Sequence, residues 1–346
     1  MLPMQRRRRK GIESIAFRAI LNLESLNGVE SVGNLSRHRT APIVIPNKNS
    51  GGYVTRYVPV VSGESLAHGY QEMLVDVAKN TSLSVGTLAQ RREFIKYAEE
   101  EYLKVDKISP PTDADDARRF EVDVLLKDVV SDIGGFLYAA KPPVKRTSRI
   151  QFGYMLPALD AIESASLEAQ FHARHVPSET KGAQAGQMPY NVEVGSALYT
   201  TTINLDIDEV AEPSIKYGNK SDKEEKLRNE KDLRKKAALS ALMQMLSSIG
   251  FGARKSRFLP NVEFVSAVAS ISSPYSFVVS SGASKDYIKT TKTRAEQFRS
   301  VISNTKSAKD PKIEIVAFDK EEKVPTEVES ASNVEELMNK ILSKAR

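Results

Sequence analysis

Residues 14–24 read Ser-Ile-Ala-Phe-Arg-Ala-Ile-Leu-Asn-Leu-Glu, and this stretch decides the class of the fold. Apolar residues occupy every second position from Ile15 to Leu23, whereas Arg18 and Asn22 fall between them. A period of two is typical of a β-strand that buries one face and leaves the other polar. The sequence therefore predicts an early strand whose polar face is available to a partner.

The same alternation and several helical periods recur further along the chain. Strands are predicted at 43–45, 53–58, 192–207, 262–271 and 313–318, and helices at 66–77, 88–103, 222–249, 285–303 and from 332 onward. With 80–190 set aside, this order predicts an α+β fold with helices on one side of a mainly antiparallel sheet, whose other face stays open. Residues 80–190 are predicted to form an inserted helical lobe, and 321–346 a C-terminal helical segment.

Composition excludes several classes of protein. The 346 residues are 40% apolar, which is enough for a sizeable core, and they include no cysteine. Disulfides, thiolate metal sites and cysteine nucleophiles are therefore excluded. No apolar run reaches the ~18 residues of a membrane span, and no secretory signal follows the basic cluster within 1–10. We expect a cytoplasmic protein with a disordered basic tail at 1–10 and no membrane partner.

Charge is concentrated in separate segments. Bases outnumber acids by four to one in 28–59, and no acid interrupts the basic residues of 141–157 or 250–260. By contrast, 99–132 holds eleven acids and five bases. Basic loops on an otherwise balanced chain favour a phosphate-binding surface, although solvated loops by chance, or contact with the acidic region of a second copy, are alternatives.

Enzyme motifs are incomplete in this chain. No Walker A sequence occurs, and Gly63-Glu-Ser-Leu-Ala67 lacks the second glycine of a nucleophile elbow. His172 and His175 have the i, i+3 spacing of a helical metal pair, but a metal site needs further ligands. We expect no cofactor and no metal, and we favour an RNA-stacking or polar role for a histidine here.

Two longer stretches resemble a known family. Residues 21–39 (LNLESLNGVESVGNLSRHR) and 59–69 (PVVSGESLAHG) are similar to the CRISPR-associated DevR autoregulator family, as are 169–174 and 252–260. Its members are the repeated backbone subunits of type I Cascade complexes, with the type I-A form most similar. The resemblance extends from about residue 13 to 320.

The resemblance implies an RNA-recognition-motif-like (ferredoxin-like) palm from 11–79 and 191–320, in a crescent-shaped molecule, with a mobile thumb-like loop near 176–192. It implies a helical filament of copies along CRISPR RNA, which presents bases to target DNA. Other Cascade subunits, including the single-copy guide-handle-binding subunit, are the further partners. The basic segments and the resemblance together predict RNA contacts at Arg18, Asn22, Asn34, Ser36, Arg37, His38, Arg39, His68, Lys145, Arg146, Arg149, His172, Arg174, Arg254, Lys255, Ser256 and Arg257.

Related subunits of type III complexes cut RNA with an aspartate in an equivalent loop. Residues 28–39 contain no aspartate, so we expect a protein that is not an enzyme. The alternative is an RNA-processing nuclease that uses His172 or His38 as general acid or base.

Overall fold

One large mixed sheet organises the chain. The computed structural model describes residues 12–47, 50–175, 187–252, 254, 256–305 and 309–344. The strands of the large sheet are β1 (Ile12–Glu24), β2 (Gly28–Val32), β3 (Leu35–His38), β8 (Ile150–Phe152), β9 (Leu156–Pro157), β10 (Ser166–His175), β11 (Gln187–Leu205), β12 (Asn261–Ser273), β13 (Lys312–Asp319) and β14 (Glu329–Ser330). They run in the order β14-β13-β12-β1-β11-β3-β2, with β8, β9 and β10 also paired to β11.

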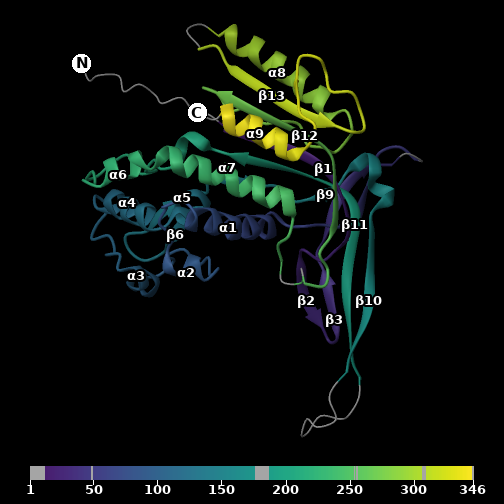
Figure 1. Ribbon diagram of the computed structural model, residues 1–346, viewed down its shortest axis with the longest axis horizontal. Coiled ribbons are helices and arrows are strands. Elements are labelled where there is room, and N and C mark those ends of the chain that lie inside the picture. The colour runs from purple at the N-terminus through teal and green to yellow at the C-terminus, as the bar shows by residue number, and fades with distance from the viewer. Residues whose placement is uncertain are drawn as a thin grey trace.

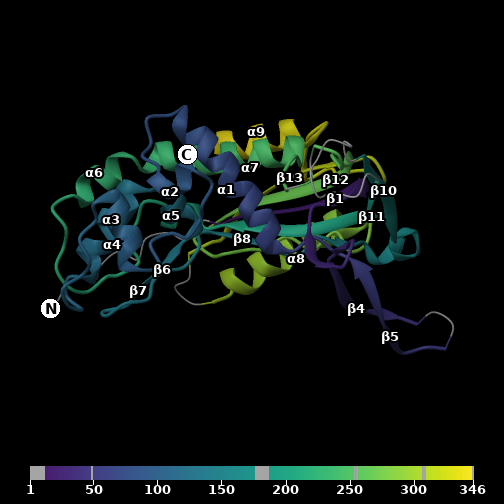
Figure 2. The ribbon, with the colours of Figure 1, turned by 90° about the horizontal axis from the view of Figure 1, so that it is seen from below.

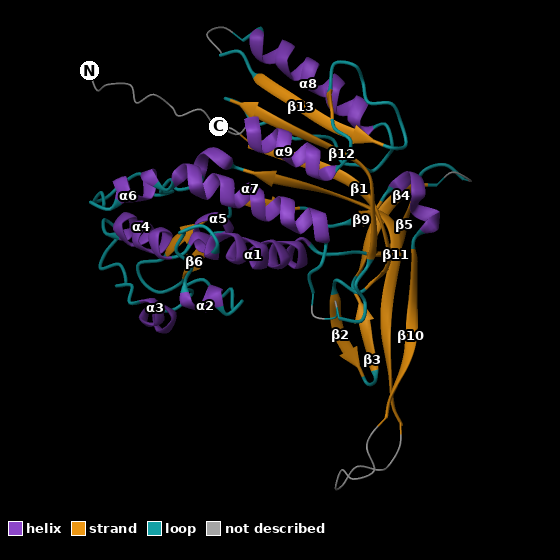
Figure 3. Ribbon diagram, in the orientation of Figure 1, coloured by secondary structure: helices purple, strands orange, loops and turns teal. Residues whose placement is uncertain are grey.

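Two smaller sheets and the helices complete the described fold. The remaining strands are β4 (Thr40–Pro46), β5 (Tyr53–Pro59), β6 (Phe136–Tyr138) and β7 (Val144–Arg146). The helices are α1 (Gly63–Lys79), α2 (Thr87–Gln90), α3 (Glu100–Asp106), α4 (Ala117–Lys127), α5 (Val129–Gly134), α6 (Glu224–Asn229), α7 (Lys231–Ser248), α8 (Tyr287–Ser303) and α9 (Val334–Lys344). Figure 3 shows how helices and strands are distributed.

Strand β1 lies in the centre of the sheet because both of its faces are apolar enough to be covered. Ile15 and Phe17 pack in one core cluster with residues of α1, α7 and α9, while Ala16 packs on the opposite face with Tyr287 of α8. Figure 1 shows α1 and α7 separated from α8 by the central strands. The predicted α+β class is confirmed, but the open sheet face is wrong, since α8 covers part of it.

The inserted region is only partly helical. Helices α2 to α5 and the β6–β7 pair form a lobe, whereas residues 150–175 form strands that join the main sheet through β11. The predicted helix at 88–103 is wrong: it is replaced by α2 and α3. Arg92, Lys96 and Tyr97 between them have positive φ values of 68°, 55° and 58°, which an α-helix does not accommodate.

Two hairpins extend from the sheet. The β4–β5 hairpin projects to one side in Figure 2, and the long β10–β11 hairpin extends away from the helices in Figure 1. The predicted thumb-like loop lies mostly at 176–186, outside the described residues, as does the basic tail. Residues 187–192 of that predicted loop are part of β11.

No helix within the described ranges is long and apolar enough to span a membrane. The last predicted helix is present as α9, and the predicted 222–249 helix is divided into α6 and α7 at Glu230.

A buried acid on β1 gives the fold a pH dependence. Glu13 is 2% exposed, and neither carboxylate oxygen has a hydrogen-bond partner. Burial raises its pKa from 4.5 to about 8, against an opposing effect of Lys235. Because the folded state keeps a proton that the unfolded chain loses, stability falls as pH rises from 4.5 to 8.

We therefore expect Glu13→Gln to raise the free energy of unfolding at pH 8 by about 2 kcal/mol and to change little near pH 4.5. Urea denaturation at several pH values measures this. The exposed Glu263→Gln is the control and should stay within about 0.5 kcal/mol of the parent. An equal effect of Glu13→Gln at both pH values would contradict the assignment.

Candidate nucleic-acid interface

Segments far apart in the sequence meet beside the β10–β11 hairpin. Strand β3 runs parallel to β11, with Leu35 opposite Asn191, and the Asn191 amide donates to the carbonyl oxygen of Asn34 at 2.8 Å. Figure 1 shows β2 and β3 alongside the long hairpin. The turn at Asn34 and the half-buried Ser36 are therefore held next to Tyr190 and its neighbours.

An aromatic group forms where the loop after α7 reaches the hairpin. His172 lies opposite Tyr190 across the β10–β11 pair, and their rings stack at 5.2 Å with an interplanar angle of 23°. Phe258 contacts His172 edge-on at 5.4 Å. The Arg257 guanidinium donates to the Tyr190 hydroxyl at 2.9 Å. Two predicted residues, His172 and Arg257, are thus brought together through two aromatic residues that the sequence prediction missed.

The loop that follows β1 touches the same basic segment. Arg254 Nη1 lies 3.4 Å from the Ser25 hydroxyl oxygen. A Cβ at Gly28 would come within 3.4 Å of this guanidinium, so glycine leaves room for it. Gly252 has a φ of +92°, which strongly favours glycine, and packs against Leu26. Gly252 and Arg254 are therefore held against residues 25–28, which follow β1.

We call this region the junction surface. It is defined by the three segments that meet here: Asn34, Ser36, Arg37 and Arg39 on and beside β3, His172 and Tyr190 on the β10–β11 hairpin, and Arg254, Ser256, Arg257 and Phe258 on the loop after α7. Within it, the buried atoms His172 Nε2 and Arg39 Nε have no hydrogen-bond partner. Buried polar atoms are normally satisfied, so these two are available to a bound ligand. Phe171 and Leu259 are exposed beside it.

Arg18 is removed from the predicted RNA contacts. Its side chain is 1% exposed, and its guanidinium bonds to Asp160, Glu321 and the carbonyl oxygen of Gly282. It therefore joins β1 to distant loops and is buried away from any RNA. Asn22, on the same strand, is exposed opposite Asn261 of β12.

Arg146 and Arg149 are also removed. Arg146 is buried with Glu121 and Asp132, and the contact to Asp132 is very short. Arg149 is 8% exposed, donates to the Ser214 hydroxyl, and has a pKa lowered by burial. Both hold the helical lobe together.

Two histidines and one lysine also differ from expectation. His38 is 3% exposed and bonded within the protein, so it neither contacts RNA nor can act as an acid or base on it. His68 lies on α1 against Phe94, with Nε2 3.5 Å from Glu72, and belongs to a different surface. Lys145 is exposed on β7 of the helical lobe, outside the junction surface.

The side chains of Arg174 and Lys255 lie outside the described residues, and their prediction stands untested. Residues 166–175 form strand β10 and not a helix, so the helical spacing considered for His172 and His175 does not apply. Among the described residues there is no cluster of three metal-ligating side chains.

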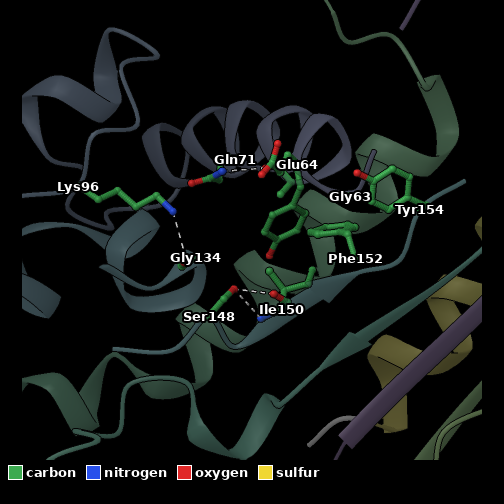
Figure 4. Close-up of a pocket in the computed structure, with 11 residues that line it drawn as sticks. Gly63, Glu64, Gln71, Lys96, Gly134, Ser148, Ile150, Phe152 and Tyr154 are labelled. Atoms are coloured by element: carbon green, nitrogen blue, oxygen red, sulfur yellow. Dashed lines mark hydrogen bonds between the residues drawn. The ribbon is translucent and has the colours of Figure 1, made fainter. Parts of the chain in front are cut away.

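A separate pocket of about 360 Å³ lies between α1 and the helical lobe (Figure 4). Lys96 Nζ donates to the carbonyl oxygen of Gly134 at 3.1 Å, and burial lowers the pKa of this lysine. The Ser148 hydroxyl donates to the carbonyl oxygen of Ile150. Lys96 and Ser148 are thus both hydrogen-bonded to backbone carbonyl groups. The pocket shares no residue with the junction surface.

Comparison with known proteins identifies the family of this chain. The family described as "CRISPR-associated negative auto-regulator DevR/Csa2" matches residues 15–292. The chain belongs to this family. It is 50% identical over 289 residues, 83% of this chain and 88% of the relative, to the "CRISPR-associated aCascade subunit Cas7/Csa2 2" of Saccharolobus solfataricus. It is 37% identical over 296 residues, 84% of this chain and 88% of the relative, to "CRISPR-associated protein Cas7/Csa2 1" of the same organism.

Solved structures support the same fold at low identity. A chain of a "CRISPR RNA-guided surveillance complex, pre-nicking" matches with a TM-score of 0.51 and 12% identity, covering 97% of this chain and all of that chain. Membership of the DevR/Csa2 family, predicted above from residues 21–39 and 59–69, is thus confirmed.

Proposed function

We propose that this DevR/Csa2 family chain is a non-catalytic subunit that binds CRISPR RNA and polymerises along it as the backbone of a type I-A Cascade complex. It holds the RNA backbone and presents bases for pairing to target DNA. This proposal is supported mainly by the groups that the fold brings together at the junction surface. Arginines, a stacked histidine–tyrosine pair and unpartnered polar atoms suit a single-stranded nucleic acid held by phosphate contacts and base stacking.

The strand order supports an RNA-recognition-motif-like palm. Strands β12, β1, β11 and β8 are neighbours in that order, and α1 and α7 pack in one core on one face of the sheet. Along the chain, β1-α1-β8-β11-α7-β12 follows the ferredoxin-like sequence of elements. The β2–β3 and β10–β11 hairpins then extend this palm at one end, where they carry the junction surface.

The relatives' names indicate the partners. The 50%-identical relative is named a subunit of archaeal Cascade, and the structural match belongs to an RNA-guided complex. For this chain we propose CRISPR RNA, further copies of itself, other Cascade subunits including the guide-handle-binding subunit, and target DNA paired to the guide. In such a complex base pairing selects sequence while protein recognises backbone shape.

Sizing of the purified protein with and without ribonuclease tests the proposal. We expect large, ribonuclease-sensitive assemblies whose co-purified RNA forms a regular ladder of protected lengths on a denaturing gel. A monomer free of nucleic acid that also ignores added CRISPR RNA at low salt would contradict it.

The nuclease alternative now rests on His172 alone, because His38 is buried and both of its ring nitrogens contact protein oxygens. Incubation of guide-complementary RNA with the protein and divalent metal should leave the RNA intact. Products that form with the parent and disappear with His172→Ala would establish an enzyme instead.

A further inference from the structure

A buried polar pair lies under the junction surface, where β1 ends. Glu24 is completely buried. Its Oε1 accepts a hydrogen bond from the Tyr199 hydroxyl at 2.9 Å, and its Oε2 accepts one from the Leu26 amide at 2.8 Å. His38 Nε2 lies 2.6 Å from the same Oε1. The carboxylate is therefore surrounded by donors from three segments of the chain.

The other side of the His38 ring faces an acceptor as well. Nδ1 lies 2.8 Å from the carbonyl oxygen of Arg39, which has no proton to give. Nδ1 must therefore carry a proton. A neutral imidazole would then turn the lone pair of Nε2 toward the Glu24 oxygen at 2.6 Å, which is repulsive. This contact is not aligned as a regular hydrogen bond, but two acceptors 2.6 Å apart repel each other, so the distance favours one further proton on the pair.

The groups around His38 also favour the charged ring. Burial is the largest single effect and opposes protonation. The Glu24 carboxylate, the backbone of Arg39 and the Glu193 charge together outweigh it, so the pKa of His38 is raised above 6.5. Besides Glu193, Tyr199 is a further titratable group that faces the pair. Its pKa is raised by burial and by Glu24, so its hydroxyl stays a donor.

The pair connects the elements that form the junction surface. Glu24 holds the turn after β1 through the Leu26 amide, and Arg254 contacts Ser25 of that turn. The His38 amide donates to Glu193 Oε2 on β11 at 2.8 Å. One cluster thus fixes β1, β3 and β11 relative to one another and to the basic loop.

We propose that His38 and Glu24 share a proton that positions the β2–β3 hairpin and the Arg254 loop, and that RNA binding weakens when this proton is lost as the pH rises. The inference rests on the proposed RNA binding. His38 is a positioning residue here, because its ring does not reach the surface. Loss of the proton leaves the Glu24 carboxylate with donors from Tyr199 and Leu26 only, among the described residues, and the repulsion between Nε2 and Oε1 then opposes the contact between β3 and the end of β1.

The direction of the pH dependence follows from the raised pKa. A histidine with a raised pKa stabilises the folded arrangement fully below pH 6.5, and this contribution is lost as pH rises through the pKa of the folded state. Glu13 also destabilises the protein as pH rises, so unfolding experiments would mix the two effects. NMR spectroscopy of the His38 ring and measurements of RNA affinity distinguish the His38 effect from the Glu13 effect.

Nitrogen NMR of the free, histidine-labelled protein tests where the proton lies. We expect one imidazole that is still mostly protonated on both nitrogens at pH 6.5, and the loss of its signals in His38→Gln. Glu24→Gln should return this ring to a neutral form at neutral pH, since an amide can donate to Nε2. A His38 ring that is neutral at pH 6.5 in the parent protein would overturn the proposal.

RNA affinity against pH tests the consequence. We expect the dissociation constant of the parent to rise by roughly tenfold above the His38 pKa, and that of Glu24→Gln to stay nearly constant. His68→Gln, which removes an imidazole on α1, should keep the parental profile. Identical profiles for the parent and Glu24→Gln would overturn the proposal. If the parent binds no RNA at any pH, the proposed function fails and the positioning role with it, while the NMR result still decides the protonation of the pair.

Discussion

Replacement of Arg37, Arg39 and Arg257 together by glutamine is expected to weaken RNA binding about a hundredfold at low salt. These arginines belong to the junction surface, and Arg257 is held toward it by the Tyr190 hydroxyl. Phosphate contacts are independent of sequence, so the reduction in affinity should be equal for unrelated RNAs. The slope of log affinity against log salt should become flatter by about 2, because each arginine that no longer neutralises a phosphate of a single strand removes ~0.7 from it.

The control removes the same charge elsewhere. Lys289, Lys312 and Lys323 are exposed on and around α8 and β13, far from the β10–β11 hairpin in Figure 1. Their replacement by glutamine lowers the net charge equally and should leave the salt slope almost unchanged. Equal reductions of affinity in the two triple variants would show that net charge, rather than the junction surface, attracts RNA. A reduction that depends strongly on RNA sequence would also contradict the proposal.

Local periodicity was sufficient to predict the central elements. The alternation from Ile15 to Leu23 identified β1, and the helical spacing of residues 66–77 and 285–303 identified α1 and α8. These patterns are determined within one element, because each reports which face that element buries. The failed helix at 88–103 contains the left-handed residues noted above, whose backbone is stabilised by packing that no local pattern reports.

The site was harder to predict because it depends on register. His172 stacks on Tyr190 only because the β10–β11 pairing places them opposite each other, and neither residue predicts that alignment. The same limit explains Arg18 and Arg146. A basic segment in the sequence does not show whether its arginines reach solvent or distant carboxylates. In this fold Asp160 and Glu121, which bind them, are far away in the sequence.

The buried arginine of the helical lobe should matter for stability and not for RNA. Arg146 is fully buried, and it donates to Glu121 of α4, to the backbone of Asp132 in α5, and to the carbonyl oxygen of Glu212. Arg146→Met would leave two buried carboxylates partly uncompensated. We expect the free energy of unfolding to fall by about 3 to 5 kcal/mol, measured by urea denaturation at neutral pH.

The neighbouring residue supplies a matched control. Lys145 is exposed on the same short strand, so Lys145→Met should change the free energy of unfolding by less than about 0.5 kcal/mol. Adding Glu121→Gln to Arg146→Met should recover part of the stability, because it removes one unpaired buried charge. Under conditions where Arg146→Met is still folded, its RNA affinity should equal the parent's. An Arg146→Met protein of parental stability that binds RNA poorly would return Arg146 to the RNA contacts predicted from its basic segment.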